Sequence, residues 1–407
     1  MTVEETLPEM GTDSLAEETQ RRSPRDAALL LASTAPRIVA ELLQSMNPAM
    51  AQDILDELDP ERRNAVLAAA SPQQRTQWLR NDGYPEDTIG RLMEPPTAVF
   101  RGKQTIASTI ESVRELSKTT LVTYLFIVDD RMRLIGIVTM RDLLLSSRDQ
   151  SLEQVMLREP FFLPPEMELP EAMKQVVRRH FPVYPVCQAD GKLLGQVRGQ
   201  AMFEEQAYEI SAQAGRMVGV DKEERLTTPW TRSLKFRHPW LQLNLVTAFL
   251  AAAVVGAFQG TIDRIVILAA FLPVLAGQSG NTGCQALAVA LRGMTLGELQ
   301  PGTERMLVMK EALLGLLNGT LVGITAGLGM FAAAKMQSHP EAVMLGIIVF
   351  IAMVGSCIVS GIAGAVIPLA LRRFGADPAT ASSIFLTTAT DVASMGLFLS
   401  LATAMIR

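Results

Sequence analysis

Five long apolar segments fill most of the last 170 residues of this 407-residue chain. Apart from Asp391, none of these segments contains a charged side chain. A helix needs about 20 apolar residues to cross the roughly 30 Å hydrocarbon core of a bilayer. We therefore predict an all-α membrane domain over residues 238–407 with five transmembrane helices, at 240–262, 265–291, 312–334, 343–371 and 378–406.

The charged residues divide the chain into an acidic part and a basic part. Through Pro229 there are 26 basic and 35 acidic residues, whereas from Trp230 onward there are 11 basic and 7 acidic residues. The acidic N-terminal residues do not resemble a secretory leader, so we expect this part to begin in the cytoplasm. Eight Lys and Arg residues then flank the spans on the inner side and three on the outer side. The positive-inside rule predicts a multi-pass protein of the plasma (inner) membrane with a cytoplasmic N-terminus and an external C-terminus.

Cysteine usage and motif content argue against several classes of function. Cys187, Cys284 and Cys357 are far apart and odd in number, which argues against a disulfide framework and against a clustered thiolate metal site. No Lys/Arg run alternates with aromatic residues, so the sequence gives no support for a nucleic-acid partner. No nucleophile and base pair or phosphate-binding loop is recognisable, so we do not expect an enzyme.

The N-terminal region is predicted to be helical after a short lead-in. Residues 1–24 are rich in Glu, Thr and Ser and poor in apolar side chains, which predicts disorder. Over residues 25–92, apolar residues recur at helical spacing in short blocks. The blocks are separated by Asn47-Pro48, Asp59-Pro60 and Ser71-Pro72, in which a capping side chain precedes a proline at the first helical position. This pattern predicts a superhelix of short helices, which we interpret as a packing module.

Two similar units follow, over residues 93–150 and 151–205. Each unit contains two strand-like runs separated by a turn, at 125–128 and 134–139 in the first and at 182–186 and 193–197 in the second. The repeated order predicts the internal duplication of one α/β module. Residues 206–237 then form a polar helical segment, which is either a plain linker or a coupling element. We favour coupling, because the segment joins the duplicated region directly to the first apolar span.

Asp391 is the strongest indication of function within the spans. It is the fourteenth of the 29 residues in the fifth span, which places the sole interior carboxylate near the middle of the bilayer. An isolated acid at that depth costs about 2.5 to 3.5 kcal/mol on insertion scales, and such residues usually mark an ion path. The alternative is a carboxyl that is protonated or paired in a helix contact. Hydroxyl side chains that could hold water around a cation surround it, namely Thr387, Thr388, Thr390 and Ser394.

The second span contains a polar interruption. Pro273 is followed by a run of glycine and polar residues from Gly277 to Gly283, and then by Gln285. Such a run weakens a helix and is tolerated only where the freed backbone groups face protein or water. Close packing of small residues would explain the glycines but not the amide side chains. We therefore predict a pore-lining segment that includes Gly280, Asn281, Gly283 and Gln285.

Magnesium fits this residue set better than a transition metal does. Mg2+ dehydrates reluctantly and is usually bound through retained waters by one or two carboxylates. One Asp391 from each subunit of a twofold dimer would present two carboxylates to a hydrated ion. A path for a dehydrated transition metal would be expected to show converging His, Cys or Met ligands. The three histidines, His180, His238 and His339, lie outside the predicted spans.

These residues together resemble the MgtE family of magnesium channels. The first duplicated unit, with Gly136 and the stretch from Thr139 to Leu143, resembles a CBS module, and two such modules normally pair. The stretch from Pro273 to Gln285 is similar to the family's Gly-Asn-x-Gly-x-Gln signature, although only one glycine directly precedes Asn281. Lys310-Glu311, Asp377-Pro378-Ala379 and the run from Thr387 to Asp391 also match.

The resemblance implies a multidomain fold, with an α-helical N-terminal superhelix, an α/β CBS-pair domain and an all-α membrane domain with five transmembrane helices. It further implies a homodimer with the pore at the subunit interface, lined by the second and fifth spans. Asp391 takes the position of the family's Mg2+-binding aspartate, and Glu311 joins the pore-lining candidates. Residues 206–237 resemble the plug helix that reports cytoplasmic Mg2+ to the pore.

The second CBS unit departs from the family where relatives commonly carry acidic residues. The chain has His180-Phe181, Cys187-Gln188 and Arg198 at those places. Acidic residues that remain as candidate regulatory Mg2+ ligands are Glu204, Glu205, Glu209, Asp221, Glu223 and Glu224. A solvated charged face explains each of them equally well, so we expect attenuated Mg2+ sensing. Related CBS pairs bind adenine nucleotides, metal ions or nothing detectable, and the sequence itself gives no support for ATP.

Three hypotheses follow for the whole chain. The leading one is a Mg2+-selective channel that imports hydrated Mg2+ and is gated by cytoplasmic Mg2+ through the N-terminal and CBS domains. The second is a proton- or sodium-coupled carrier of divalent cations, in which Asp391 is a proton relay. The third is a membrane-tethered CBS nucleotide sensor without conduction. Asp391 and the interrupted second span argue against the third, because a membrane anchor needs neither.

Overall fold

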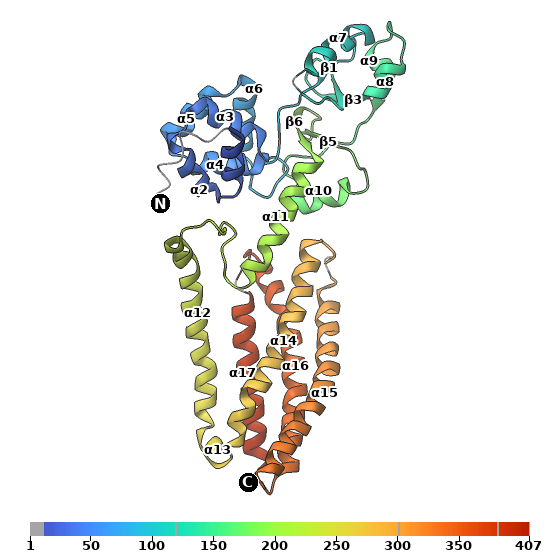
Figure 1. Cartoon of the computed structure of the whole chain (residues 1–407). Coiled ribbons are helices and arrows are strands. Elements are labelled where there is room, and N and C mark those ends of the chain that lie inside the picture. The colour runs from blue at the N-terminus through green and yellow to red at the C-terminus, as the bar shows by residue number, and fades with distance from the viewer. Residues whose placement is uncertain (1–11, 119, 300–301, 381, 407) are drawn as a thin grey trace. The chain divides into compact units, whose positions relative to one another are not determined.

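The computed structural model describes residues 12–118, 120–299, 302–380 and 382–406 (Figure 1). The chain divides into two compact units. Unit 1 comprises Met1–Glu209 with Arg225–Thr228, and unit 2 comprises Ile210–Glu224 with Pro229–Arg407. Unit 1 holds the N-terminal helices and the CBS pair, and unit 2 holds the membrane helices.

The N-terminal helices are short. They are α1 (Thr12–Gln20), α2 (Pro24–Leu30), the 3-10 helix η3 (Leu31–Ser33), α3 (Pro36–Ser45), α4 (Pro48–Glu57), α5 (Pro60–Ala69) and α6 (Pro72–Asn81). Helices α4, α5 and α6 begin at the prolines that the sequence predicts. The side chains of Asn47, Asp59 and Ser71 each accept a hydrogen bond from a backbone N–H in the first turn of the next helix. Each cap is followed by a proline at the first helical position, where its missing N–H costs nothing.

The disorder prediction for residues 1–24 is wrong for α1. Leu15 is buried in the hydrophobic core of the N-terminal helices, and the buried Thr19 hydroxyl donates a 2.6 Å hydrogen bond to the Leu15 carbonyl oxygen. The composition of this stretch is polar, but a single leucine that reaches a core supplied by later helices is enough to order one short helix. Residues 1–11 of the predicted lead-in lie outside the described residues.

The duplicated region forms a four-stranded and a two-stranded sheet. Its elements are β1 (Val99–Arg101), α7 (Ile106–Leu116), β2 (Tyr124–Val128), β3 (Leu134–Thr139), α8 (Met140–Leu145), α9 (Leu152–Val155), β4 (Leu157–Arg158), α10 (Leu169–Val176), β5 (Val183–Cys187) and β6 (Leu193–Arg198). The first sheet has the order β1-β2-β3-β4, with β1 and β2 parallel and the other pairs antiparallel, and the second is the β5-β6 hairpin.

The two hairpins share an irregularity that supports the internal duplication. The antiparallel register shifts at Ile127/Val128 in the first hairpin and at Val186/Cys187 in the second. A glycine follows in each second strand, and an added Cβ atom would lie 2.6 Å from Met156 Cγ at Gly136 and 2.9 Å from the Glu94 carbonyl oxygen at Gly195. Both glycines therefore allow a neighbouring segment to approach the strand closely.

The predicted single helix over residues 206–237 is divided in the structure. Helix α11 runs from Gly199 to Met217, and twelve residues separate it from the start of α12 (Trp230–Ala257). Gly219 has a φ angle of +78°, a conformation that non-glycine residues rarely adopt, and it ends the helical path behind α11. The same region therefore contains the end of one helix, a connecting loop and the start of the first apolar helix.

Unit 2 is a bundle of long helices (Figure 1). After α12 come α13 (Gln259–Arg264), α14 (Ile267–Thr295), α15 (Glu304–Met336), α16 (Ala342–Arg373) and α17 (Ser382–Met405). Among the described residues, four helices are long and apolar enough to cross a membrane, namely α12, α15, α16 and α17. The polar run in the middle of α14 lowers its mean hydropathy, so the predicted second span, residues 265–291, remains a prediction.

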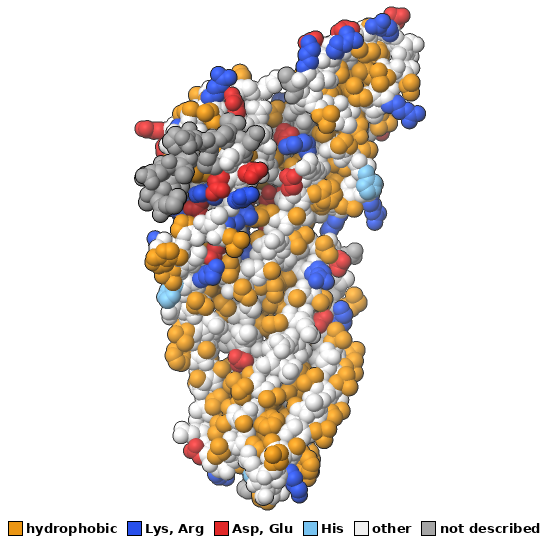
Figure 2. Space-filling view, in the orientation of Figure 1, with side chains coloured by type: hydrophobic (Ala, Val, Ile, Leu, Met, Phe, Trp, Pro, Cys, Tyr) orange, Lys and Arg blue, Asp and Glu red, His pale blue; other side chains and the backbone are white. Residues whose placement is uncertain are grey.

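The membrane helices differ in how closely they pack. Four glycines at every fourth position of α15 are buried against α16, namely Gly315, Gly319, Gly323 and Gly327. Lipid gives apolar helices little hydrophobic reason to associate, so close backbone contact of this kind supplies the attraction. By contrast, only 6% of the apolar window of α12 is buried, and α12 packs mainly on α17. The face of the bundle shown in Figure 2 carries many hydrophobic side chains and few charged ones.

Candidate functional site

The polar run of α14 lies beside the segment of α17 that carries Asp391. A Cβ atom added at Gly280 would lie 4.0 Å from Thr390 Oγ1, and one added at Gly283 would lie 2.9 Å from Leu386 Cδ1. These two glycines, which lie about one turn apart, therefore let α14 approach α17 closely. Tertiary packing in this way brings together the two features that the sequence analysis selected separately.

Asp391 is partly exposed on α17, and its carboxylate has no hydrogen bond or ion pair to any described residue. On α14, the amide side chains of Asn281 and Gln285 are exposed and lie one turn apart. An unpaired carboxylate and exposed amides in an apolar bundle need water or a polar neighbour from outside this chain. This face of α14 and α17 is therefore our candidate ion pathway.

The hydroxyl groups near Asp391 bond within their own helix. Thr387 and Thr388 are partly exposed, and each donates to the Ile384 carbonyl oxygen, at 3.1 and 2.8 Å. Thr390 and Ser394 are fully buried, and their hydroxyls donate to the carbonyl oxygens of Thr387 and Asp391, at 3.0 and 3.3 Å. Of the four predicted hydroxyl ligands, the structure leaves only Thr387 and Thr388 accessible in this chain.

Two other predicted pore-lining residues lie in helix contacts. Gly283 is buried, and a Cβ atom added there would also lie 3.2 Å from the Ser360 carbonyl oxygen of α16. Glu311 is buried near the start of α15, where a Cβ atom added at Gly361 would lie 2.5 Å from its carbonyl oxygen. Its carboxylate lies 3.8 Å from Lys310 Nζ. The structure thus gives Gly283 and Glu311 packing positions, away from the exposed face that carries Asn281.

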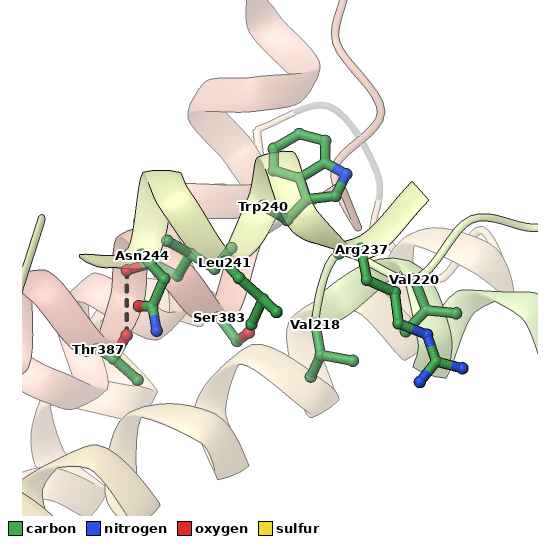
Figure 3. Close-up of a pocket in the computed structure, with 10 residues that line it drawn as sticks. Val218, Val220, Arg237, Trp240, Leu241, Asn244, Ser383 and Thr387 are labelled. Atoms are coloured by element: carbon green, nitrogen blue, oxygen red, sulfur yellow. Dashed lines mark hydrogen bonds between the residues drawn. The ribbon is translucent and has the colours of Figure 1, made fainter. Parts of the chain in front are cut away.

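A pocket of about 390 Å³ opens at the end of unit 2 where α17 begins (Figure 3). In Figure 3, Trp240, Leu241 and Asn244 come from α12, and Ser383 and Thr387 come from α17. Its lining is completed by the segment behind α11 and two further residues, namely Val218, Gly219, Val220, Arg237 and Ile384. Sequence reasoning did not select most of these residues, because only the tertiary structure brings the three segments together.

The candidate regulatory acids do not converge. Among the described residues, no group of three or more His, Cys, Asp or Glu side chains is placed to hold a metal ion. In unit 1, the Glu204 carboxylate accepts hydrogen bonds from Gln200 Nε2 at 2.8 Å and Asn47 Nδ2 at 3.4 Å. Two further candidates, Glu205 and Glu209, lie along the same helix, α11.

The other three acids lie in the loop of unit 2 between α11 and α12. The Asp221 carboxylate accepts a 2.9 Å hydrogen bond from the backbone N–H of Glu223. The Glu224 carboxylate accepts a 2.9 Å hydrogen bond from Arg237 Nε, and this guanidinium lowers the pKa of Glu224. Glu224 is therefore already neutralised by a partner within the chain.

Unit 1 contains a polar groove of about 650 Å³ between the N-terminal helices and the CBS pair. Within it, Arg198 Nε donates a 2.8 Å hydrogen bond to Glu94 Oε1, and Gln196 Oε1 accepts from the backbone N–H of Thr97 at 3.3 Å. Burial raises the pKa of Glu94, although Arg198 opposes the shift. The Arg198 guanidinium is thus engaged by a carboxylate and offers little free charge to a phosphate.

Family models match most of the chain. The model described as a divalent cation transporter, MgtE, matches residues 272–401, and the MgtE intracellular N domain matches residues 5–87. The CBS domain matches twice, at residues 89–149 and 152–204. The order of these matches is the order of the helical module, the duplicated unit and the membrane helices in the structure.

Similar proteins agree with the family matches. The magnesium transporter MgtE of Enterococcus faecalis is 27% identical over 326 residues, which cover 80% of this chain and 70% of the relative. The Bacillus subtilis MgtE is 26% identical over 330 residues, covering 79% of this chain and 70% of the relative. A crystal structure of the cytosolic domain of the Mg2+ channel MgtE in complex with ATP is similar at a TM-score of 0.43 and 22% identity, over 48% of this chain and 80% of that one. The chain belongs to the MgtE family of divalent cation transporters.

Proposed function

We propose that this chain is a Mg2+-selective channel that imports hydrated Mg2+ through a pore at the interface of a homodimer. The observation that carries the proposal is the partly exposed Asp391 carboxylate on α17, a helix that packs against α14 with its exposed amide side chains. Mg2+ keeps most of its waters in proteins and is bound by one or two carboxylates through them. In a dimer, two copies of Asp391 and of the exposed side of α14 that carries Asn281 supply the carboxylates and amides for such a site around a hydrated ion.

A second copy of the chain is the partner that best explains the exposed polar face. Gln278, Asn281 and Gln285 are exposed along one side of α14. Amide groups facing hydrocarbon would each cost several kcal/mol, roughly what an unsatisfied polar group costs in lipid. Pairing with the same face of a second copy around a twofold axis satisfies them with water and protein instead.

We further propose an orientation and a mode of regulation. The helical module (25–92), the two CBS units (93–150 and 151–205) and the coupling segment (206–237) precede the membrane domain (238–407). The N-terminus lies in the cytoplasm and the C-terminus outside. Cytoplasmic Mg2+ acts through the N-terminal and CBS domains, with a weakened response because several candidate acids are already engaged. Arg198 of the CBS pair is paired with Glu94, so we assign no nucleotide to this domain.

Flux into sealed liposomes under controlled gradients tests the channel against the carrier hypothesis. The purified chain is reconstituted, and Mg2+ entry is followed with an internal indicator at a fixed Mg2+ gradient. We expect the initial rate to be the same with and without an imposed proton or sodium gradient, once the membrane potential is clamped with valinomycin and K+. A rate that requires either gradient would favour the coupled carrier, and a complete absence of flux would favour a non-conducting sensor.

A further inference from the structure

Three membrane helices, α14, α16 and α17, pack against one another (Figure 1). They meet at Gly283 of α14, which lies against the Ser360 carbonyl oxygen of α16 and against Leu386 of α17. About one turn earlier on α14, the packing is looser. Among the described residues, a Cβ atom added at Gly280 would have Thr390 Oγ1 of α17, at 4.0 Å, as its only neighbour within 4 Å outside α14. The junction is therefore tight at Gly283 and leaves space beside Thr390.

The directions of the three helices bring buried hydroxyl groups to one level of the bundle. Helices α14 and α16 run parallel, because their next contact, between Ala286 and Gly364, lies further along both chains. Helix α17 runs in the opposite direction, since the two α14 glycines meet it in reverse order. One turn back from the junction on α14 and α16, and one turn forward on α17, therefore lie Ser279, Ser356 and Thr390. All three side chains are fully buried, so their hydroxyls share one interior layer.

Two hydroxyl groups at this junction lack a hydrogen-bond partner. Among the described residues, the buried Ser356 Oγ and Ser360 Oγ of α16 neither donate to another group nor accept from one. Several other hydroxyls of the membrane helices donate to a carbonyl oxygen one turn back in their own helix, as Thr320 of α15 does to Leu316 at 2.7 Å. A buried hydroxyl without a partner loses its hydration and gains nothing in return. These two serines therefore require a partner other than the protein groups around them.

The spacing of the two serines suits a water molecule. Residues four apart on a helix share one face, with Cβ atoms about 5–6 Å apart, and a water that makes two hydrogen bonds of about 2.8 Å spans such a gap. The hydroxyls of Ser279 and Thr390 donate to carbonyl oxygens of their own helices, at 3.1 and 3.0 Å, and their oxygens keep lone pairs that can accept. A buried water usually makes about three hydrogen bonds, so the layer offers enough partners.

We propose that the junction of α14, α16 and α17 binds a structural water molecule, held by the two α16 serines and by the hydroxyl oxygens of Ser279 and Thr390. Thr390 immediately precedes Asp391 on α17 and is fully buried, whereas Asp391 is partly exposed. The water therefore lies inside one chain and not on the face that carries Asp391. It links α17 to α16 and so helps to fix the position of Asp391. Its binding depends on helix packing and not on conduction.

Serine-to-alanine substitution distinguishes a bridging water from unpaired hydroxyls by the sign of the effect. Ser356→Ala, Ser360→Ala and the double variant are compared by thermal unfolding of the full-length chain in one detergent. We expect each single variant to lower the melting temperature by about 2 to 4 °C, the shift that follows from losing roughly one hydrogen bond. The double variant should lose little more than either single variant, because both hydroxyls hold the same water.

Ser382→Ala is the matched control, since this buried serine donates to the Pro378 carbonyl oxygen just before α17. Its effect should add to that of Ser356→Ala, because the two serines share no partner. Two results would overturn the water site. A raised melting temperature in either α16 variant would show a dry, unpaired hydroxyl. Fully additive losses in the Ser356→Ala, Ser360→Ala double variant would show that each serine bonds separately.

X-ray radiolysis tests for the water directly, because a bound water yields hydroxyl radicals that oxidise a nearby sulfur atom. Cys357 follows Ser356 on α16 and is buried, and its Sγ accepts from Thr282 Oγ1 of α14 at 3.6 Å. Met330 of α15 is equally buried, within a hydrophobic core, and serves as the control. With each rate normalised to the unfolded chain, we expect Cys357 to be oxidised faster than Met330 in the parent and as slowly in the double variant. Equal rates in the parent chain would contradict a water at the junction.

Discussion

Gly283 of α14 lies against Leu386 of α17, close enough that an added Cβ atom would be 2.9 Å from the leucine Cδ1. The same atom would be 3.2 Å from the Ser360 carbonyl oxygen on α16, so the glycine is enclosed by two helices. This contact sets how closely the polar run of α14 approaches Asp391. It explains the glycine at position 283, because the polar neighbours of Gly283 suggest a surface that faces water, whereas Gly283 itself is packed between helices.

The first prediction concerns this contact. Gly283→Ala should destabilise the membrane bundle by about 1 to 3 kcal/mol, because one flexible side chain and one backbone carbonyl must move to admit the methyl group. Gly277→Ala is the matched control, since nothing lies within 4 Å of a Cβ atom added there. Thermal unfolding of both variants in the same detergent measures the difference. Equal stability of the two variants would show that the helix contact is looser than described.

The second prediction concerns conduction. Asp391→Asn keeps the shape of the side chain but removes its fixed negative charge, so the chain should fold while Mg2+ uptake falls roughly tenfold or more, as expected for losing a full charge beside a cation in a low-dielectric site. Uptake into a magnesium-starved strain and flux into liposomes measure the loss. Asp263→Asn, which removes a carboxylate outside the spans, should retain the parent rate. Normal uptake by Asp391→Asn would remove Asp391 from the pathway.

The third prediction concerns orientation. With a cysteine introduced at the end of the chain as Arg407→Cys, just beyond the fifth predicted span, a membrane-impermeant maleimide should label the chain from outside intact cells. The parent chain gives the background, and Cys187 should not contribute to it, because burial raises the pKa of its thiol to about 12 and the reactive thiolate is scarce near neutral pH. Labelling of Cys187 should rise only when the protein unfolds. Modification of Arg407→Cys from the cytoplasmic side alone would contradict the predicted topology.

The fourth prediction concerns gating by cytoplasmic Mg2+. Mg2+ shifts the equilibrium between the open and closed states only as far as its affinities for those two states differ. A chain with fewer free acids offers Mg2+ fewer sites at which the affinities can differ. Glu224 is already paired with Arg237, and the second CBS unit has His180, Cys187 and Arg198 where relatives commonly carry acids. We expect Mg2+ to close this channel less steeply, or only at higher concentration, than a relative with an acid-rich CBS pair. Patch recordings of open probability against bath Mg2+, made in the same way on both proteins, test this expectation. Equally steep closure at the same Mg2+ concentration would contradict it.

Local sequence determined the features that depend on neighbouring residues. Asn47-Pro48 and Ser71-Pro72 begin helices because the cap and the proline act on the first turn alone. Apolar length predicted five spans, since crossing a bilayer is a property of one continuous segment, and four of them are long and apolar enough among the described residues. Asp391 was also recognisable without a structure, because a lone carboxylate in an apolar run is costly wherever its helix packs. The repeated strand pattern likewise predicted two α/β units.

Only the tertiary structure decided the features that depend on distant residues. Helix α1 is ordered because Leu15 reaches a core built by later helices, and the break behind α11 places Gly219 against Trp240. The sequence predicts Thr390 and Ser394 as pore ligands, but helix packing buries both side chains. Their hydroxyls donate to backbone carbonyl oxygens of the same helix. The sequence predicts Glu224 as a candidate Mg2+ ligand, whereas in the structure Arg237 pairs with its carboxylate. In each case burial and pairing are set by residues from another segment, so no local pattern could determine them.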